Sequence, residues 1–596
     1  MMKFIKNLGW PKIVLFVFWA FLFSWVEKEN ITLFLFPGKS FEGRSALLQI
    51  SLIGAYTLPF AMLFFLLISL LEKIFVYWNR VDWSGIDGKL PGHYKNIIVF
   101  SVIALLLVYP LKYVLGFLSF PYPLEYREVA VVSPAIALAN GINVYSFENF
   151  PEHIYLYGIL YPLTLSPFVN LGDHPMLVAR AYNVFFLAAF LGLSFWIFRK
   201  RNASNTSTLI GVLILLNSMC YIWTMNGSRP DAPALFFSFL GFYFLLNRDF
   251  DGLGIFLCAF SCVISFYFKQ YLFFSTLVVA AFLFLFVSKQ KAYLFVAAVA
   301  ALGLTSFIVI RSYFPLYYEY SILHHIVISA PSISTSRMEE QTSTFLGYYW
   351  VIFLLYFFYL YKTVLTLDLS RLKETRLSPI KLKEPFLCYA SVDIFGVGVI
   401  FAIVTLIFWL GKHGGNIYTY YGELLLPFLL YFTIPKIDSL FKFDVHRTFI
   451  QVLILVFCVF TFRLNYEQDY SSWNESFAFL SQYAAQCENI YDETPLIAVY
   501  KIENKISPVY NNGQIEYAQT AIPDRETIFG RLSTAPNEYL TQQLFKWNNE
   551  IENSIKNQEF DCIFSDDKQQ IENYTEAAKI PFILGWTIYV RVPLEP

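Results

Sequence analysis

The stretch DAPALFFSFLGFYFLLNRDFDGLGIFLCAFSCVISFYFKQ, from Asp231 to Gln270, contains two apolar runs of helical length. A short charged turn, NRDFD, separates the two runs, and Lys269 and Gln270 end the second one. Apolar runs on both sides of so short a turn predict two consecutive membrane helices. Similar runs recur along most of the chain, which predicts a multi-pass α-helical membrane protein.

The composition agrees with this class. Of the 596 residues, 57% are hydrophobic, 20% are aromatic and only 15% are charged. A water-soluble domain cannot hide so much apolar surface. The net charge of -1 says nothing about nucleic acid, and no basic tail or stripe suggests such a partner, so we expect none.

We predict about thirteen membrane spans, at residues 13–26, 46–71, 97–117, 177–198, 208–225, 234–246, 253–268, 271–287, 293–310, 345–361, 394–410, 420–434 and 449–462. With the N-terminus in the cytoplasm, lysine and arginine concentrate in the inner loops, as the positive-inside rule requires. The loops 119–176 and 311–344 and the tail 465–596 then lie outside. We expect the protein in the plasma or inner membrane, with its N-terminus in the cytoplasm.

The tail, residues 465–596, is polar and differs from the membrane part, residues 1–464. Its strand-like runs at 495–500, 505–510, 560–564 and 585–592 alternate with helical patterns such as 537–557, which predicts a C-terminal extracytoplasmic α/β domain. Cys487 and Cys562 face an oxidising space in this topology, where a disulfide can form.

The outer loop 119–176 begins with paired acids in LEYREVAVVSPAIALANGINVY, residues 124–145. Glu125 and Glu128 are three residues apart, so on a helix they point the same way. Paired carboxylates can divide labour, one taking a proton while the other orients the substrate. The alternative is a solvated helix start that favours acids near its dipole. The helical pattern ends at Gly141, a plausible cap, and a later apolar segment, 155–172, is typical of an interfacial helix.

Three further polar clusters interrupt the apolar pattern, and all map to the outer face. Arg229 and Asp231 lie in a tight turn between two spans, and Lys269 and Gln270 separate two others. The third cluster precedes or opens a late span: Lys412, His413, Asn416, Tyr421 and Glu423. Turn, capping and snorkelling roles explain each cluster alone, but their convergence on one face predicts a single cavity there.

Taken together, these motifs resemble the GT-C class of membrane glycosyltransferases, bacterial relatives of the protein mannosyltransferase and aminoarabinose transferase families. The resemblance covers nearly the whole chain. Its parts are PLEYRE followed by NG and VY, then LYGILYPL at residues 156–163, the Arg229–Asp231 turn, the Lys269–Gln270 pair and the late Asn416–Tyr421–Glu423 segment. The usual first acid is Asp, often directly followed by Glu, so the departure here leaves the base open between Glu125 and Glu128.

The resemblance implies a GT-C fold and transfer of a sugar, with inversion, from a polyprenyl-phosphate donor to an extracytoplasmic acceptor. Glu125 or Glu128 is then the base, and Lys269 and Arg229, helped by Lys412, hold the donor phosphate. The neighbouring Asp231, Gln270, His413, Asn416, Tyr421 and Glu423 complete the substrate site. Membrane lipids surround the chain, and the tail selects the acceptor. No cofactor is certain, and a divalent metal remains open.

Two other functions fit a multi-pass chain. Transporters and lipid flippases place charged groups near the midplane and often contain two similar halves, whereas the polar clusters here lie at outer ends and no repeated halves are visible. A polymerase or ligase of lipid-linked glycans would share the same chemistry. A scaffold would leave the acids and basic residues unexplained.

Overall fold

The computed structural model describes residues 92–123, 126–150, 155, 157–171, 174–201, 203–217, 228–323, 426–428, 430–431, 433–435, 451, 475–480, 485–492, 509–511, 537–565, 571, 574–579 and 587–591. The predicted spans 13–26, 46–71, 345–361 and 394–410 lie outside these residues. The spans 208–225, 420–434 and 449–462 are described only in part.

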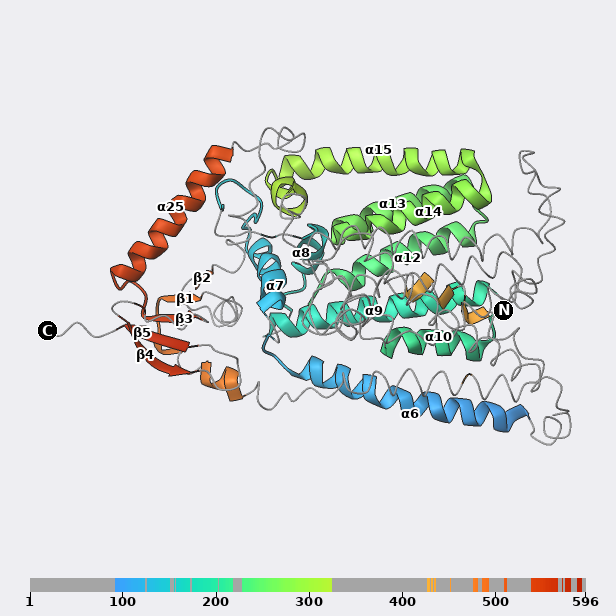
Figure 1. Ribbon diagram of the computed structural model, residues 1–596, viewed down its shortest axis with the longest axis horizontal. Coiled ribbons are helices and arrows are strands. Elements are labelled where there is room, and N and C mark those ends of the chain that lie inside the picture. The colour runs from blue at the N-terminus through green and yellow to red at the C-terminus, as the bar shows by residue number, and fades with distance from the viewer. Residues whose placement is uncertain are drawn as a thin grey trace, which may run out of the picture. The chain divides into compact units, whose positions relative to one another are not determined.

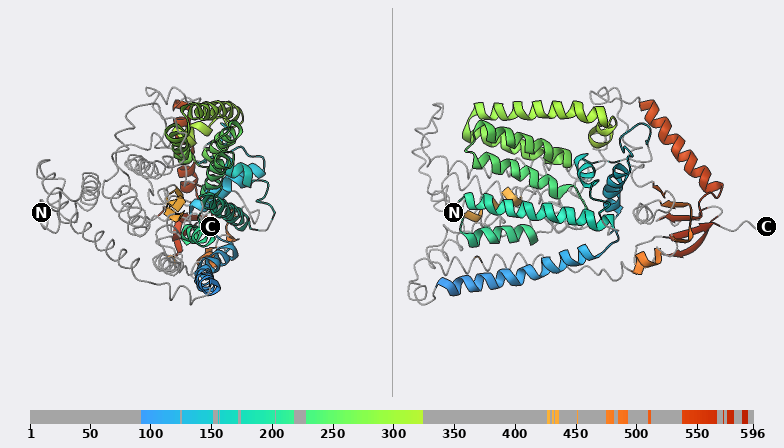
Figure 2. Two further views of the ribbon diagram at one scale, coloured as in Figure 1. Left: turned by 90° about the vertical axis from the view of Figure 1, so that its right-hand side faces the viewer. Right: turned by 180° about the vertical axis from the view of Figure 1, so that it is seen from behind.

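Apolar helices make up most of the described chain before residue 324 (Figure 1). Where the predicted spans can be compared, helices occupy them to within a few residues. The helices are α6 (Gly92–Ser119), α9 (Pro175–Lys200), α10 (Asn205–Asn217), α12 (Asp231–Asn247), α13 (Gly252–Phe268), α14 (Phe273–Phe282), the π-helix η2 (Leu283–Val287) and α15 (Lys289–Tyr313). Helix α13 packs against both α12 and α15, and the three run side by side in Figures 1 and 2.

Both ends of α13 are set by polar residues. The Asp251 side chain accepts a hydrogen bond of 2.6 Å from the Gly254 N–H and so caps the first turn. At the other end the backbone of Lys269 is extended, with φ of -152°, and a short 3₁₀ helix, η1 (Gln270–Leu272), leads into α14. This break in the helix places Lys269 where two apolar helices meet.

Helix α15 carries the clearest lipid-facing surface. Both α9 and α15 are long and apolar enough to cross a membrane, and only 6% of the most apolar part of α15 is buried. Leu304 and Ile308 are 63% and 59% exposed. Large apolar side chains exposed along a whole helix are unfavourable in water and favourable in a bilayer. The described part of the chain therefore supports the membrane class.

Two shorter helices belong to the segment between α6 and α9. Helix α7 (Tyr126–Ala139) ends as predicted, because Gly141 takes a left-handed conformation with φ of +79°. The N–H of Gly141 bonds the Leu138 carbonyl, and the N–H of Ile142 bonds the Ala137 carbonyl. This is the Schellman arrangement that closes a helix C-terminus. Helix α8 (Leu160–Leu165) is the short helix predicted in the second apolar segment.

The tail contains a five-stranded sheet in the order β2-β1-β3-β5-β4. Strands β1 and β2 and strands β1 and β3 are parallel, whereas β5 runs antiparallel to β3 and β4. Helix α25 (Asn537–Lys556) packs Ile551 and Ile555 on the sheet residues Tyr491, Ile563 and Tyr574. The strands are β1 (Ile490–Asp492), β2 (Val509–Asn511), β3 (Cys562–Ser565), β4 (Tyr574–Lys579) and β5 (Thr587–Arg591).

A disulfide joins Cys487 to Cys562, with 5.9 Å between the two Cα atoms, so these cysteines pair as the sequence allowed. The strand prediction is confirmed in part by β2, β3 and β5. It missed β1 and β4, and the predicted strand 495–500 lies outside the described residues.

The chain divides into two compact units. The first unit is Met1–Leu105, Phe198–Ile214 and Ser332–Thr461, and the second is Leu106–Ile197, Leu215–Pro331 and Phe462–Pro596. The predicted boundary between residues 464 and 465, and the extracytoplasmic location of the tail, stay predictions.

Candidate active site

Two buried ion pairs lie in the second unit, where α7, α9, the start of α12 and the end of α13 supply charged side chains. Glu128 pairs with Arg180, and Asp231 pairs with Lys269. All four side chains are at most 6% exposed. Buried charges are tolerated when each is paired and hydrogen-bonded, and both conditions are met here.

Glu128 is held by a bidentate contact. Arg180 donates from Nε to Oε1 at 3.0 Å and from Nη2 to Oε2 at 2.7 Å, and the backbone N–H of Ser228 donates to Oε1 at 3.2 Å. The alternative of a solvated helix start is wrong for Glu128, because its side chain is fully buried. Its carboxylate fixes the turn that precedes α12 against α7.

Arg180 was not among the predicted site residues. Besides Glu128 it bonds the backbone carbonyls of Phe120 and Tyr122, the second at 2.6 Å. Its guanidinium thus ties the chain before α7 to α9. In the sequence it looks like one polar residue near the start of a span, and an arginine inside an apolar run is itself a signal for a buried partner.

The second pair joins two predicted residues. Lys269 donates to Asp231 Oδ1, and the Tyr271 hydroxyl donates to the same oxygen at 2.7 Å. The Lys269 ammonium also lies 5.0 Å from the Tyr271 ring centroid and 5.6 Å from that of Tyr157, within reach of a cation–π attraction. Asp231 occupies the first turn of α12, where the helix dipole favours an acid. The structure therefore brings two motifs 38 residues apart into direct contact.

The segment before α8 packs directly on the end of α13 through Gly158. A Cβ atom at Gly158 would lie 2.0 Å from the Tyr267 carbonyl oxygen and 2.5 Å from that of Phe268. Only glycine allows this approach of two backbones. The glycine of LYGILYPL therefore positions the neighbouring Tyr157 beside Lys269.

Gln270 takes part in a second polar network. Its amide donates to the Ser321 carbonyl at 2.9 Å, and the Ser321 hydroxyl contacts the Tyr145 hydroxyl at 3.1 Å. The Tyr145 hydroxyl in turn donates to the Tyr157 carbonyl at 3.0 Å. Burial raises the pKa of Tyr145 well above its usual range, so this phenol stays protonated. The tyrosine of the VY motif thus fixes the loop beside the ion pair.

An apolar groove of about 680 Å³ lies next to this cluster, between α8, α9, α12 and α13. One of its lining residues, Phe268, directly precedes Lys269, which pairs with Asp231. Its polar hydroxyls, Thr164 and Tyr182, bond each other at 2.7 Å. The lining is Leu160, Thr164, Phe168, Leu171, Val178, Tyr182, Phe185, Phe186, Phe237, Ile264 and Phe268. Such a surface suits a hydrocarbon chain.

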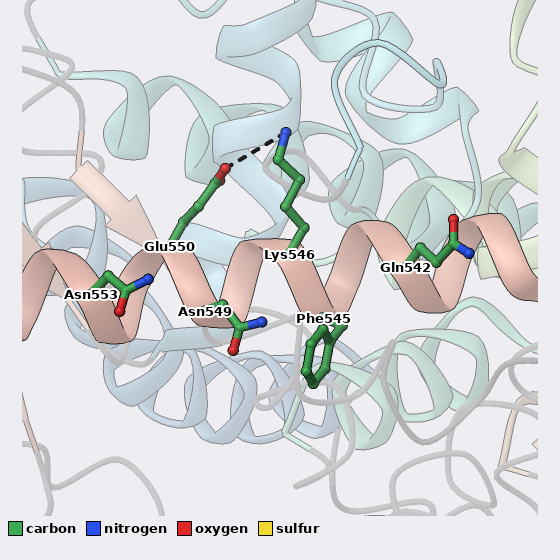
Figure 3. A pocket seen from close by; sticks show the side chains of 6 residues that line it. All are labelled: Gln542, Phe545, Lys546, Asn549, Glu550 and Asn553. Atoms are coloured by element: carbon green, nitrogen blue, oxygen red, sulfur yellow. Dashed lines mark ion pairs between the residues drawn. The ribbon is translucent and has the colours of Figure 1, made fainter.

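A second hollow, of about 420 Å³, lies on the outer face of α25 (Figure 3). Phe545, which is 68% exposed, stands in it among polar side chains, and Lys546 pairs with Glu550 at 3.6 Å. All of its lining residues come from this one helix. Without a second element to enclose a ligand, we do not regard it as an active site.

The remaining predicted site residues are only partly described. Arg229 is half-buried. In the sequence it stands between Ser228, whose N–H bonds Glu128, and Asp231, which pairs with Lys269. Six predicted residues lie outside the described part: Glu125, Lys412, His413, Asn416, Tyr421 and Glu423. Within the described part, His, Cys, Asp and Glu nowhere form a group of three that could hold a metal ion.

No protein-family profile and no curated protein sequence matches this chain. Among solved structures, ArnT from Cupriavidus metallidurans bound to undecaprenyl phosphate matches with a TM-score of 0.52 and 10% sequence identity. The match covers 82% of this chain and 98% of that one. The chain has the fold of ArnT. The fold that the resemblance to aminoarabinose transferases implies is thereby confirmed.

The same ArnT in its apo state matches with a TM-score of 0.41 and 9% identity, over 82% of this chain and 98% of that one.

Proposed function

We propose that this chain transfers a sugar from a polyprenyl-phosphate donor to an acceptor on the outer side of the membrane. One observation carries the proposal. The apolar groove is lined by Phe268, and the next residue, Lys269, belongs to the charged cluster. A donor of this class has the matching shape, because a long hydrocarbon tail ends in one phosphate group. The ArnT structure of the same fold was obtained with undecaprenyl phosphate, and we extend that ligand class to this chain.

The groove is the proposed site of the lipid tail. Aromatic rings dominate its lining, and Phe185 and Leu171 are 65% and 75% exposed. A tail could therefore enter from the surrounding lipid. Because Thr164 and Tyr182 satisfy each other, the groove exposes little unsatisfied polarity, so a tail can pass from the lipid into it without leaving polar groups unpaired.

Arg229 and Lys269 are the proposed contacts of the donor phosphate. Arg180, Arg229 and Lys269 supply cationic side chains to this part of the chain, beside the acids Glu128 and Asp231. Arginine suits a phosphate because its planar guanidinium donates two parallel hydrogen bonds. Charge on the leaving phosphate increases as its bond to the sugar breaks, so these contacts strengthen in the transition state. Lys412, outside the described residues, is a further proposed contact.

Glu125 is the proposed base, because Glu128 is already bonded to Arg180 and to Ser228. An acceptor hydroxyl or amine attacks the anomeric carbon, and its proton passes to the Glu125 carboxylate. The bond from that carbon to the phosphate oxygen breaks, and polyprenyl phosphate leaves with the electron pair. Attack opposite the leaving group inverts the anomeric configuration. Glu423 is proposed to orient the acceptor.

Native mass spectrometry of the purified protein with added undecaprenyl phosphate tests the donor site. We expect a bound polyprenyl lipid, and we expect Arg229→Ala to weaken binding by about tenfold or more, as for the loss of a charged hydrogen bond. Arg248→Ala is the matched control, since Arg248 follows the other end of α12 and pairs with Asp251 in an exposed position. Retention of bulk phospholipid alone would contradict the proposal and favour a transporter.

A further inference from the structure

A short segment with two prolines links α6 to α7 and precedes Glu125 in the chain. Its sequence at residues 120–123 is FPYP, so Phe120 and Tyr122 each stand directly before a proline. Proline has no N–H with which to continue a helix, and it holds the residue before it in an extended conformation. The carbonyl oxygens of Phe120 and Tyr122 are therefore left to partners other than a helix.

Arg180 in α9 supplies these partners. Its Nη1 donates to the Phe120 carbonyl, and its Nη2 donates to the Tyr122 carbonyl at 2.6 Å. The same guanidinium holds both oxygens of the Glu128 carboxylate. Glu125 itself lies outside the described residues, but Tyr122 stands three positions before it and Glu128 three positions after it. One buried side chain thus fixes the chain on both sides of Glu125.

A fully buried guanidinium is a costly means of joining two helices. Apolar side chains of similar volume often stabilise a fold as well as a buried ion pair does, or better. What arginine adds is geometry, because its planar fork sets the direction of every acceptor that it binds. The contacts of Arg180 therefore suit the precise placement of residues 120–128 more than the stability of the fold.

Phe477, in the predicted tail 465–596, packs on the same segment. Residues 475–480 are helical, and Phe477 is 3% exposed. Its ring stacks on that of Tyr122, with the centroids 5.0 Å apart and the planes 2° from parallel, and it meets the Phe120 ring edge-on at 6.2 Å. The tail and α9 thus contact the same two residues ahead of Glu125.

We propose that Arg180 and Phe477 are positioning residues, which hold the segment 120–128, and with it Glu125, in place for proton transfer. The role of Glu125 as the base rests on the proposed function, whereas the holding of the segment does not. A base must lie within hydrogen-bond reach of the proton that it takes, and a displacement of about 1 Å can cost about a hundredfold in rate. The tail then acts on the chemistry through Tyr122, besides any contact with the acceptor.

Hydrogen exchange followed by mass spectrometry tests the holding of the segment without any activity. Phe477→Leu keeps an apolar side chain but loses the ring that stacks on Tyr122, so peptides covering residues 120–130 should exchange several-fold faster. Phe560→Leu is the matched control, because Phe560 is also 3% exposed in the tail and its ring lies 5.6 Å from that of Tyr491. It should leave these peptides at the wild-type rate. Equal exchange in wild type and Phe477→Leu, or equal acceleration by both variants, would overturn the proposal.

Kinetics then test whether the segment serves the base. The donors are undecaprenyl phosphate carrying one hexose or one pentose, and mass spectrometry measures the undecaprenyl phosphate released. Phe477→Leu should lower kcat about tenfold and leave KM for the donor within twofold, because a base acts in the transition state. Phe560→Leu should change neither value. Arg180→Lys keeps a charge beside Glu128 but loses the planar fork, so it should behave as Phe477→Leu does.

A second background isolates Glu125. Residues that act as a unit have non-additive effects on the rate, so Phe477→Leu should lower kcat no further in a Glu125→Gln protein. Wild-type kcat for Phe477→Leu, or an equal loss in both backgrounds, would show that Phe477 does not act through Glu125 and would overturn the proposal. Failure of the proposed function gives a different result, since wild type then consumes neither donor. The role of Glu125 falls with it, while hydrogen exchange still decides whether the segment is held.

Discussion

Arg180 holds both oxygens of the Glu128 carboxylate, with Nε 3.0 Å from Oε1 and Nη2 2.7 Å from Oε2, and neither side chain is exposed. The two residues are 52 positions apart and connect α7 to α9. An acid placed in this way orders the site through its neighbours, since the Ser228 N–H that begins the α12 turn also depends on it. These contacts are the reason why Glu125, and not Glu128, is the proposed base.

Glu128→Ala should destabilise the protein, because it leaves the Arg180 guanidinium buried without its counter-charge. Removing one partner of a buried pair costs about 3–5 kcal/mol, measurable as a lower Tm in detergent. The control Arg248→Ala breaks an exposed pair with Asp251 and leaves the Asp251 cap of α13 in place, so its Tm should change little. A Glu128→Ala protein with the Tm of wild type and no transfer activity would instead place Glu128 in the chemistry.

Glu125→Gln should remove transfer while leaving Tm unchanged. The amide is close in shape to the carboxylate but cannot take the proton of the acceptor, and loss of a general base reduces rates by about 10²–10⁴-fold. Transfer from an undecaprenyl-phosphate sugar, followed by mass spectrometry of the released lipid phosphate, measures the effect. Full turnover by Glu125→Gln would mean that the base is another residue.

The helices could be predicted from the sequence because apolar content is local information. The span predicted at 234–246 corresponds to α12, Asp231–Asn247, and the cap predicted at Gly141 follows from the need for a left-handed residue. The ion pair of Glu128 could not be predicted in this way. Its partner Arg180 is distant in sequence, and the burial of both depends on how α7 and α9 pack.

The sheet shows a similar limit. Strand β4, YTEAAK, was missed because it is polar and contains few β-branched residues. It is an edge strand, and a polar edge avoids pairing with a second chain. Strand β3 was predicted because CIFS is fully buried and apolar enough to stand out.

Gly158→Ala should disturb the cluster around Lys269. The new Cβ would lie 2.0 Å from the Tyr267 carbonyl oxygen, so one backbone must move, and the Tyr157 ring beside Lys269 moves with it. We expect a lower Tm together with weaker binding of undecaprenyl phosphate. Gly192→Ala is the matched control, because no atom lies within 4 Å of its added Cβ. Equal Tm and lipid binding for the two variants would show that the close contact does not constrain the site.

The disulfide between Cys487 and Cys562 should stabilise the sheet of the tail. It closes a loop with a sequence separation of 75 and links the residues before β1 to β3. Loss of such a bond costs about 2–5 kcal/mol, chiefly because the unfolded tail gains freedom. The double variant Cys487→Ser/Cys562→Ser should therefore be cut faster by protease within residues 537–591, while α9 and α15 stay protected.

Reducing agent separates the disulfide from other effects of these substitutions. It should make wild type as sensitive to protease as the double variant and should leave the double variant unchanged. The cysteines Cys258 and Cys262 are free and buried in α13, so reduction does not alter them. If alkylation of the denatured, unreduced protein labelled Cys487 and Cys562 as readily as Cys258, the two would not be paired in the cell. The tail would then not have matured in an oxidising compartment, and its predicted outer location would lose its chemical support.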